Sequence, residues 1–326
     1  MKPAKLVLLT DTLRSLYEQM LRIRRAEERL VKSFHEGLIP GPFHSSLGQE
    51  AVAVGVCHHL RADDAVFGTH RGQGHAIAKG VDMTALFAEI YGREDGCCGG
   101  RAGPSFFASP RQGFVGAGIA PGTSVQLAVG AATAFQTLGS DQVAVAFLGD
   151  GAARSGTFFE SAHLAADWKL PVVLICERNQ FAGRRAAQGA GSGPAGAAAR
   201  YFEIPGFEVD GNDVTMVYAA AFEGVRHARE GKGPMIVECA TLRWRPFSES
   251  DMPSRPVEAG GPADTIDPLV MLADRLVDHH GAVSAELAEW DKRIRKEVDD
   301  SHRAAASSPW PSAATDEADS GDDRHA

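Results

Sequence analysis

The sequence predicts an α/β protein with a parallel sheet flanked by helices, and three observations support this fold class. Residues 143–148 and 171–176 are short, continuous apolar runs of the kind that form parallel strands buried on both faces. Residues 155–168, which lie between them, carry apolar side chains at helical spacing. A strand, a helix and a second strand in this order form the repeating unit of a parallel sheet.

Length and composition limit the number of domains, the kinds of partner and the cellular compartment that can be expected for this chain. The chain has 326 residues, of which 44% are hydrophobic, so it can hold a sizeable core in one large domain or two smaller ones. The net charge of −9 argues against non-specific binding of nucleic acid. No signal peptide and no apolar run of membrane-spanning length are evident, so no membrane partner is expected. Five cysteines, an odd number lying partly in apolar runs, indicate reduced thiols and a cytoplasmic location.

The part of the chain before the two strands is predicted to be mainly helical. Residues 13–37 show an amphipathic pattern that ends at a glycine, so we predict one long helix with a solvated charged face. A second helix is expected to end near Leu60. An alanine-rich helix over residues 124–135 follows a glycine-containing turn.

The part after the strands begins with residues 183–199, which are rich in Gly, Ala and Arg and predict a mobile loop. Residues 191–196 match Gly-x-Gly-x-x-Gly by letter. We reject them as a dinucleotide site because no strand precedes them and Pro194 lies inside the match.

The C-terminal elements alternate between helix and strand and end in a polar tail. We predict a helix over 214–229, a strand over 235–242, and helices over 267–278 and 284–302. Residues 1–302 are therefore assigned to the α/β domain. Residues 303–326 form an acidic tail with too little apolar content to pack, so we predict that they are disordered.

Polar residues follow both predicted strands at their carboxyl ends, where open α/β sheets bind ligands. Asp150 comes directly after the first strand, and Asn179 comes just past the second. A carboxylate and an amide oxygen suit Mg²⁺, which keeps other positions for phosphate and water. Glycine allows close backbone approach to a diphosphate, and a following helix offers its N-terminus to the charge. The residues expected to contact that group are Gly149, Asp150, Gly151 and Ala152.

The spacing of these residues resembles a known cofactor motif. Gly-Asp-Gly, followed after 26 residues by Arg178-Asn179, resembles the thiamine-diphosphate motif, which usually has Asn at the position of Arg178. The resemblance implies thiamine diphosphate as cofactor, with Asp150, Asn179 and the backbone carbonyl of Phe181 as ligands of Mg²⁺. Gly-Asp-Gly alone would leave open an ordinary turn between a strand and a helix.

Segments on both sides of this motif resemble the α subunit of the thiamine-dependent decarboxylating component of 2-oxo acid dehydrogenase complexes. The resemblance covers roughly residues 13–302. His44 matches the family's His before Gly-Gln-Glu-Ala, and His70-Arg71 match a pair implied to hold the cofactor diphosphate, for which the Arg fork is apt. Gly118 and Ala120 are implied to contact the cofactor rings through backbone atoms. From the residues alone, His44 is equally explained as a structural histidine, and Arg71 as part of a surface ion pair.

Residues 243–251 resemble the family's active-site loop, with changes that affect proton transfer. Arg243, Ser248, Ser250 and Asp251 are retained, and Ser248 is a candidate catalytic residue. The two loop histidines are replaced by Arg245, which stays protonated, and by Phe247, which carries no proton.

A third family histidine is replaced by Gln73. Proton transfer then falls to the histidines that remain near the implied cofactor, since only His changes charge near neutrality. These candidates are His44, His70 and His75, and His44 is the first choice for a catalytic acid or base.

The resemblance implies an enzyme that decarboxylates a 2-oxo acid and passes the acyl group to a lipoyl-bearing carrier. It also implies an α2β2 heterotetramer, in which the cofactor lies between α and β subunits and a Glu of the β subunit activates it. No equivalent Glu is evident here, so the α chain alone is expected to be inactive.

Three alternatives stay open at this point. One is a transketolase-like transfer of a two-carbon ketol unit from a ketose phosphate to a carrier, which the lost histidines and Arg245 would suit. Another is a non-catalytic assembly subunit, against which the retained Asp150, Asn179 and Arg71 argue. A nicotinamide-dependent dehydrogenase is the least supported, because no strand-linked dinucleotide motif is present.

Overall fold

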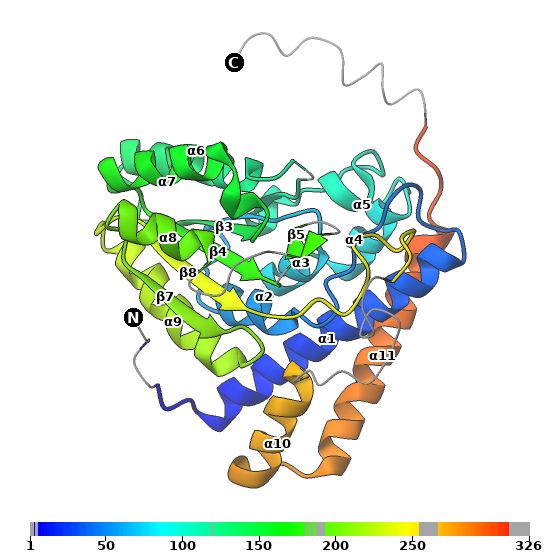
Figure 1. The fold of residues 1–326 in the computed structure, drawn as a ribbon. Coiled ribbons are helices and arrows are strands. Elements are labelled where there is room, and N and C mark those ends of the chain that lie inside the picture. The colour runs from blue at the N-terminus through cyan, green and yellow to red at the C-terminus, as the bar shows by residue number, and fades with distance from the viewer. Residues whose placement is uncertain are drawn as a thin grey trace.

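The computed structural model describes residues 3, 6–118, 120–179, 181–182, 185–186, 193–253 and 267–312. At its centre is a six-stranded sheet in the order β2-β1-β3-β4-β8-β7 (Figure 1). Every neighbouring pair in this sheet is parallel, which confirms the predicted fold class. The strands are β1 (Ala65–Phe67), β2 (Phe114–Gly116), β3 (Ala144–Gly149), β4 (Val172–Arg178), β7 (Gly206–Asp210) and β8 (Met235–Ala240).

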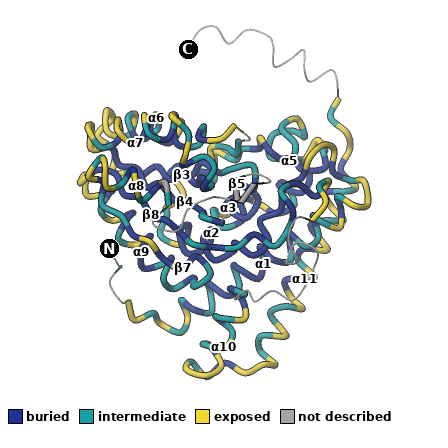
Figure 2. Tube along the Cα trace, viewed as in Figure 1, coloured by how far each residue is buried: buried dark blue, intermediate teal, exposed yellow. Residues whose placement is uncertain are grey.

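Side chains of the central strands alternate between two apolar cores, one on each face of the sheet. Val145 and Phe147 belong to the core shared with the helices α1 (Thr10–His35), α2 (Glu50–Cys57) and α9 (Val214–Arg229). Ala146 and Leu148 belong to the core shared with α6 (Thr123–Thr137) and α7 (Gly156–Asp167). Figure 1 shows these helix layers on opposite sides of the sheet, and Figure 2 shows the buried residues concentrated between them. Burial on both faces explains why β3 and β4 are continuous apolar runs.

Several charged residues of α1 pair with other helices, contrary to the prediction of a solvated charged face. Arg24 is buried and donates to Glu50 at 2.5 Å and to Asp267 at 3.0 Å, which ties α1 to α2 and to the start of the C-terminal helices. The guanidinium of Arg25 donates to Asp291 at 2.6 Å. Amphipathic periodicity alone does not reveal that other helices cover the polar side of α1.

The other elements complete the two layers. They are α3 (Gln73–Lys79), α4 (Met83–Ile90), α5 (Gly103–Phe106), α8 (Pro194–Tyr201), α10 (Pro268–His280), α11 (Ser284–Ser307), the two-stranded antiparallel sheet of β5 (Phe181–Ala182) and β6 (Arg185–Ala186), and the 3₁₀ turns η1 (Pro110–Gln112) and η2 (Ala152–Arg154).

Two predictions about loops and termini are corrected. Part of the expected loop over 183–199 forms α8, which begins at a proline in the favourable first-turn position. The ordered domain does not end at residue 302, because α11 continues to Ser307. Val298, Ser301 and Ala305 keep one buried stripe through these turns, and alanine is the best helix former. Of the rest of the predicted disordered tail, residues 308–312 are described, with Ser308 buried. Residues 313–326 lie outside the described residues, as do residues 183–184 and 187–192 of the expected loop.

Within the described part of the chain, no helix has the length and apolar content needed to cross a membrane.

Candidate active site

A cavity of about 490 Å³ lies at the carboxyl ends of β3 and β4. Its wall is formed by residues from segments that are far apart in the sequence. Of the residues predicted as site residues, the wall includes His44, His70, Arg71, Gly118, Ala120, Gly149, Asp150, Gly151, Ala152, Asn179 and Ser248. The sheet explains the convergence, because parallel strands present their carboxyl ends at one edge.

The strand-end side of the cavity is built by Gly149–Ala152 and by Asn179. Gly149 pairs with Glu177 in the β3–β4 register, so the segments after the two strands start side by side. Asp150 and Asn179 are both buried. The amide nitrogen of Asn179 donates to Gln49 Oε1 at 3.3 Å, which orients the amide with its oxygen on the opposite side.

The backbone beside Asp150 leaves room for a ligand. A Cβ added at Gly149 or Gly118 would meet no heavy atom within 4 Å, so both residues border open space. After Gly151 the chain enters η2, and α7 begins only at Gly156, capped by the Ser155 hydroxyl. The helix predicted over residues 155–168 is therefore confirmed to within one residue at each end.

Buried cationic and ring nitrogen groups form another part of the wall. Arg71 donates to two backbone carbonyls, Ser45 O at 2.6 Å and Phe247 O at 2.9 Å, and no described carboxylate is ion-paired with it. Burial, followed by the like charge of Arg243, lowers the pKa of Arg71 to about 9. Two buried guanidinium groups on one wall favour an anion in the cavity, because an anion offsets their mutual repulsion.

His70 lies beside Arg71 and contributes a polar atom without a protein partner. Its Nε2 is buried and has no hydrogen-bond partner among the described residues. Burial lowers the pKa of His70 well below its usual value, and the Arg71 charge acts in the same direction. The ring is therefore neutral near pH 7 and can bond to an oxygen of a ligand in the cavity.

His44 is held in one orientation by the loop that covers it. Its Nδ1 is 2.6 Å from Phe247 O, and because a carbonyl only accepts, Nδ1 carries the proton and Nε2 is unprotonated in the neutral ring. The ring packs edge-on against His70 and Phe247, with centroids 4.8 Å and 4.9 Å away. Burial is the main cause that lowers the pKa of His44, so the base form is favoured.

The chain is similar to proteins of one family along most of its length. The model of the dehydrogenase E1 component family matches residues 18–314. The chain belongs to the dehydrogenase E1 component family.

The similar proteins are α-type subunits of this family. The alpha subunit of acetoin:2,6-dichlorophenolindophenol oxidoreductase from Cupriavidus necator is 39% identical, over 94% of this chain and 93% of the relative. The pyruvate dehydrogenase E1 component subunit alpha from Rhizobium meliloti is 39% identical, over 90% of this chain and 86% of the relative. The human somatic, mitochondrial form of that subunit is 32% identical, over 95% of this chain and 79% of the relative. Membership of the E1 component family supports the general use of thiamine diphosphate.

The changed loop of this E1 component, residues 243–251, uses its two replaced positions differently. Phe247 lines the cavity. Arg245 is not part of the described wall, because its guanidinium forms an ion pair with the buried carboxylate of Glu249, in which Arg245 Nε lies 3.0 Å from Glu249 Oε1. Ser248 lines the cavity, but its hydroxyl bonds to Phe43 O at 3.3 Å and to Ser250 Oγ at 3.0 Å. Ser248 thus fastens the loop to the segment that precedes His44.

The structure does not bring His75 to the cavity. His75 is buried on α3, where its Nε2 lies 3.1 Å from Glu177 Oε1 and its ring stacks on Phe147 at 3.8 Å. It belongs to the layer beneath the strand ends, so its prediction as a proton carrier at the cofactor is corrected. Spacing from His70 could not reveal this, because α3 turns the side chain inward. Phe181 begins β5 two residues beyond Asn179, and its carbonyl as a metal ligand stays a prediction.

Some wall residues were missed by the sequence analysis as site residues. Thr69 and Ser124 line the cavity, and so does Arg243, which had been noted only as a retained loop residue. Thr69 immediately precedes His70-Arg71, and Ser124 lies in the first turn of α6, just after the glycine-containing turn, so proximity to predicted residues was the available signal. Arg178, the changed motif position, pairs with Glu208 at 2.7 Å and with the buried Glu238 at 2.6 Å.

Proposed function

We propose that this chain is the α subunit of a thiamine-diphosphate- and Mg²⁺-dependent E1 component, which decarboxylates a 2-oxo acid and passes the acyl group to a lipoyl-bearing carrier. One observation carries the proposal. A single cavity combines the oxygen donors of Asp150 and Asn179, at adjacent strand ends, with the buried Arg71, whose guanidinium bonds to backbone carbonyls and forms no ion pair with a described carboxylate. A divalent cation and a diphosphate together satisfy this arrangement.

The residues present fit these groups in charge and in space. Asp150 and Asn179 would hold Mg²⁺, with the Phe181 carbonyl as a further ligand. Arg71 and the unpartnered Nε2 of His70 would bond to diphosphate oxygens. The open space beside Gly149 and Gly118 admits close approach of the cofactor to the backbone. Bound thiamine diphosphate supplies a carbon nucleophile that adds to a carbonyl and accepts the electron pair when the carbon–carbon bond breaks.

His44 is the group of this chain that moves a proton in the proposed reaction. The Phe247 carbonyl fixes its Nδ1–H, so Nε2 is the atom that accepts a proton and later returns it. The depressed pKa keeps this atom unprotonated at neutral pH. The Phe247 side chain adds an apolar surface beside His44 and His70, which limits the access of water to both rings.

The site of this chain is proposed to be half of a complete site. No glutamate lies on the cavity wall formed by the described residues, which supports an activating carboxylate supplied by another chain. The similar proteins from Cupriavidus necator and Rhizobium meliloti are themselves named as alpha subunits. Together these observations support a β subunit as partner in an α2β2 assembly. The five free cysteines support a reducing compartment such as the cytoplasm.

The ketose-phosphate alternative loses one of the changes that favoured it. Arg245 was expected to suit such a donor together with the lost histidines, but its guanidinium is paired with Glu249 and is not on the described wall. Pyruvate and acetoin, which appear in the names of the relatives, carry no phosphate group that would need such a ligand.

The test is binding and turnover of the chain with and without its β subunit. Calorimetry should give weak binding of thiamine diphosphate and Mg²⁺ to the isolated chain and tight binding to the complex. The complex should then turn over pyruvate, a branched 2-oxo acid or acetoin with an oxidised lipoyl acceptor. Full-affinity binding by the isolated chain would overturn the half-site. Tight binding by the complex without turnover of any donor, ketose phosphates included, would identify an assembly subunit.

A further inference from the structure

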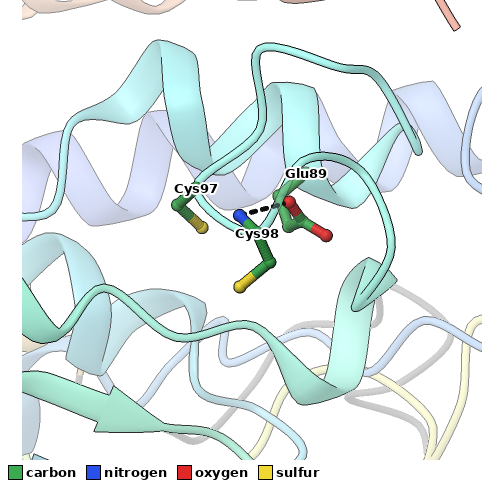
Figure 3. A group of neighbouring side chains, drawn as sticks. All are labelled: Glu89, Cys97 and Cys98. Carbon is green, nitrogen blue, oxygen red and sulfur yellow. Dashed lines mark hydrogen bonds between the residues drawn. The ribbon is translucent and has the colours of Figure 1, made fainter. Parts of the chain in front are cut away.

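Two adjacent cysteines lie in the loop after α4, apart from the cavity. The thiols of Cys97 and Cys98 and a carboxylate oxygen of Glu89 all lie within 4.8 Å of one another (Figure 3). Both cysteines are half-buried, and neither belongs to the described cavity wall. The proposed function assigns no role to this cluster.

Three potential ligands so close together could in principle bind a metal ion, but the hydrogen bonds of the Glu89 carboxylate argue against a metal site. Glu89 Oε2 accepts the backbone N–H groups of Cys98 at 2.7 Å and Gly100 at 2.9 Å. Its Oε1 accepts those of Ala102 at 2.7 Å and Gly103 at 3.1 Å. Four donors fill the acceptor sites of a carboxylate, so Glu89 clamps the loop and has no lone pair left for a cation. The two thiols are then the only reactive groups of the cluster.

Cys98 is activated relative to the other cysteines. A hydrogen bond from Cys97 is the main cause that lowers the pKa of Cys98, and the backbone of Ala108 contributes. The pKa of Cys97 is raised, chiefly by the same hydrogen bond, so Cys97 keeps its proton. By contrast, burial raises the pKa of Cys57 to about 12, and it also raises the pKa values of Cys176 and Cys239. Reactivity follows exposure and thiolate character: exposure favours Cys97 and Cys98 over the three buried cysteines, and thiolate character favours Cys98 over Cys97.

We propose that Cys97 and Cys98 form a peroxide-oxidisable dithiol, in which Cys98 is the attacking thiol and Cys97 the resolving thiol. The Cys98 thiolate attacks one oxygen of hydrogen peroxide, the O–O bond breaks, and hydroxide leaves to become water, so that Cys98 becomes a sulfenic acid. Cys97 then attacks Cys98 Sγ, the S–O bond breaks, and hydroxide departs with the Cys97 proton as a second water. Two thiols lose two electrons and two protons, and one peroxide is reduced to two waters.

The state of Cys98 is linked to the cavity through backbone contacts. The Sγ of Cys98 accepts from Ala108 N at 3.2 Å and donates to Ala108 O at 3.3 Å. The neighbouring carbonyl of Phe107 accepts from Ala117 N at 3.0 Å, and Gly118, the next residue, lines the cavity. A disulfide to Cys97 removes the thiol proton, so the bond that Cys98 Sγ donates to Ala108 O is lost. Oxidation is therefore expected to loosen the segment 107–118.

The test uses the full chain, alone and in complex with its β subunit. After peroxide treatment and alkylation, the tryptic peptide of residues 94–101, which contains both cysteines and no others, should lose two hydrogen atoms in mass. Dithiothreitol should reverse the change. In Cys97→Ser, Cys98 should stop at a sulfenic acid that dimedone traps, and in Cys98→Ser, Cys97 should stay a thiol. Serine keeps the size and the hydrogen-bonding ability of cysteine at both positions, so both variants are expected to fold.

Hydrogen exchange supplies a second readout that does not depend on the proposed function. Amides of residues 107–118 should exchange faster in the oxidised wild-type chain than in the reduced chain, and peroxide should not change them in Cys98→Ser. The proposal is overturned if the peptide stays a dithiol at peroxide doses that oxidise glutathione, or if Cys97 is oxidised equally in Cys98→Ser. A disulfide without any change in exchange would overturn the link to the cavity.

Discussion

The two sides of the cavity are built in different ways. The strand-end side consists of Gly149–Ala152 and Asn179, and the loop side consists of His44, Arg71 and residues of the loop 243–251. On the strand-end side, Asp150 and Asn179 line the cavity just past the ends of β3 and β4, and the proposed binding of Mg²⁺ depends on their side-chain oxygens. On the loop side, the backbone carbonyl of Phe247 accepts both from His44 and from Arg71. Any residue at position 247 has that carbonyl. The comparison explains how the loop can lose the family's histidines while His44 and Arg71 keep their places.

The largest expected effect concerns His44, the side chain that the loop positions. In the assembled complex, His44→Ala should slow turnover by roughly 100-fold, within the usual range for a general acid or base. Cofactor affinity should change little, because His44 is not expected to contact the diphosphate. Steady-state turnover at saturating cofactor, beside calorimetric affinity, measures both quantities.

His70→Ala is the matched control, since its ring lies 4.8 Å from that of His44. It should weaken cofactor binding more than it slows turnover at saturation, the reverse of His44→Ala. Wild-type turnover in His44→Ala would remove His44 from the mechanism and favour an assembly subunit.

The next largest effect is expected on the strand-end side. Asp150→Asn should lower Mg²⁺-dependent cofactor affinity by about tenfold or more, which corresponds to about 1.4 kcal/mol or more. Asn179→Ala should have a smaller effect, because a hard cation loses more with a charged ligand than with an amide. Calorimetry of each complex at several Mg²⁺ concentrations measures the effect, and normal binding by both variants would contradict the metal assignment.

The sequence predicted the strand-end side better than the loop side for a physical reason. Continuous apolar runs locate β3 and β4, and the residue after a parallel strand lies at the sheet edge whatever its neighbours are. The short strands β1 and β7 gave weaker signals and were missed as strands. His75 was misplaced because α3 turns it toward Glu177. The pairing of Arg245 with Glu249 depends on how the loop folds back, which local pattern does not encode.

The pH dependence of the reaction tests how deeply the loop buries His44. Since burial lowers its pKa from the usual 6.5, the base form persists to lower pH than for an exposed histidine. The acid limb of kcat/KM should therefore lie below pH 6.5, and at that pH more than half of the neutral rate should remain. A profile of kcat/KM between mildly acidic and neutral pH measures it, and His44→Ala should lack this limb. An acid limb above pH 6.5 would mean that another group titrates.

The smallest effect on cofactor affinity is expected for a change of the Phe247 side chain, which tests the difference between the two sides of the cavity most directly. Phe247→Leu keeps the backbone carbonyl that holds His44 and Arg71, and it removes only ring contacts with His44, His70 and Arg71. Cofactor affinity of the complex should therefore stay within about 0.5 kcal/mol, or about twofold, of wild type. Calorimetry of Phe247→Leu beside Asp150→Asn compares the two sides of the cavity under one set of conditions. A tenfold loss in Phe247→Leu would show that the loop holds the cofactor site through its side chain, and the distinction between the two sides would fail.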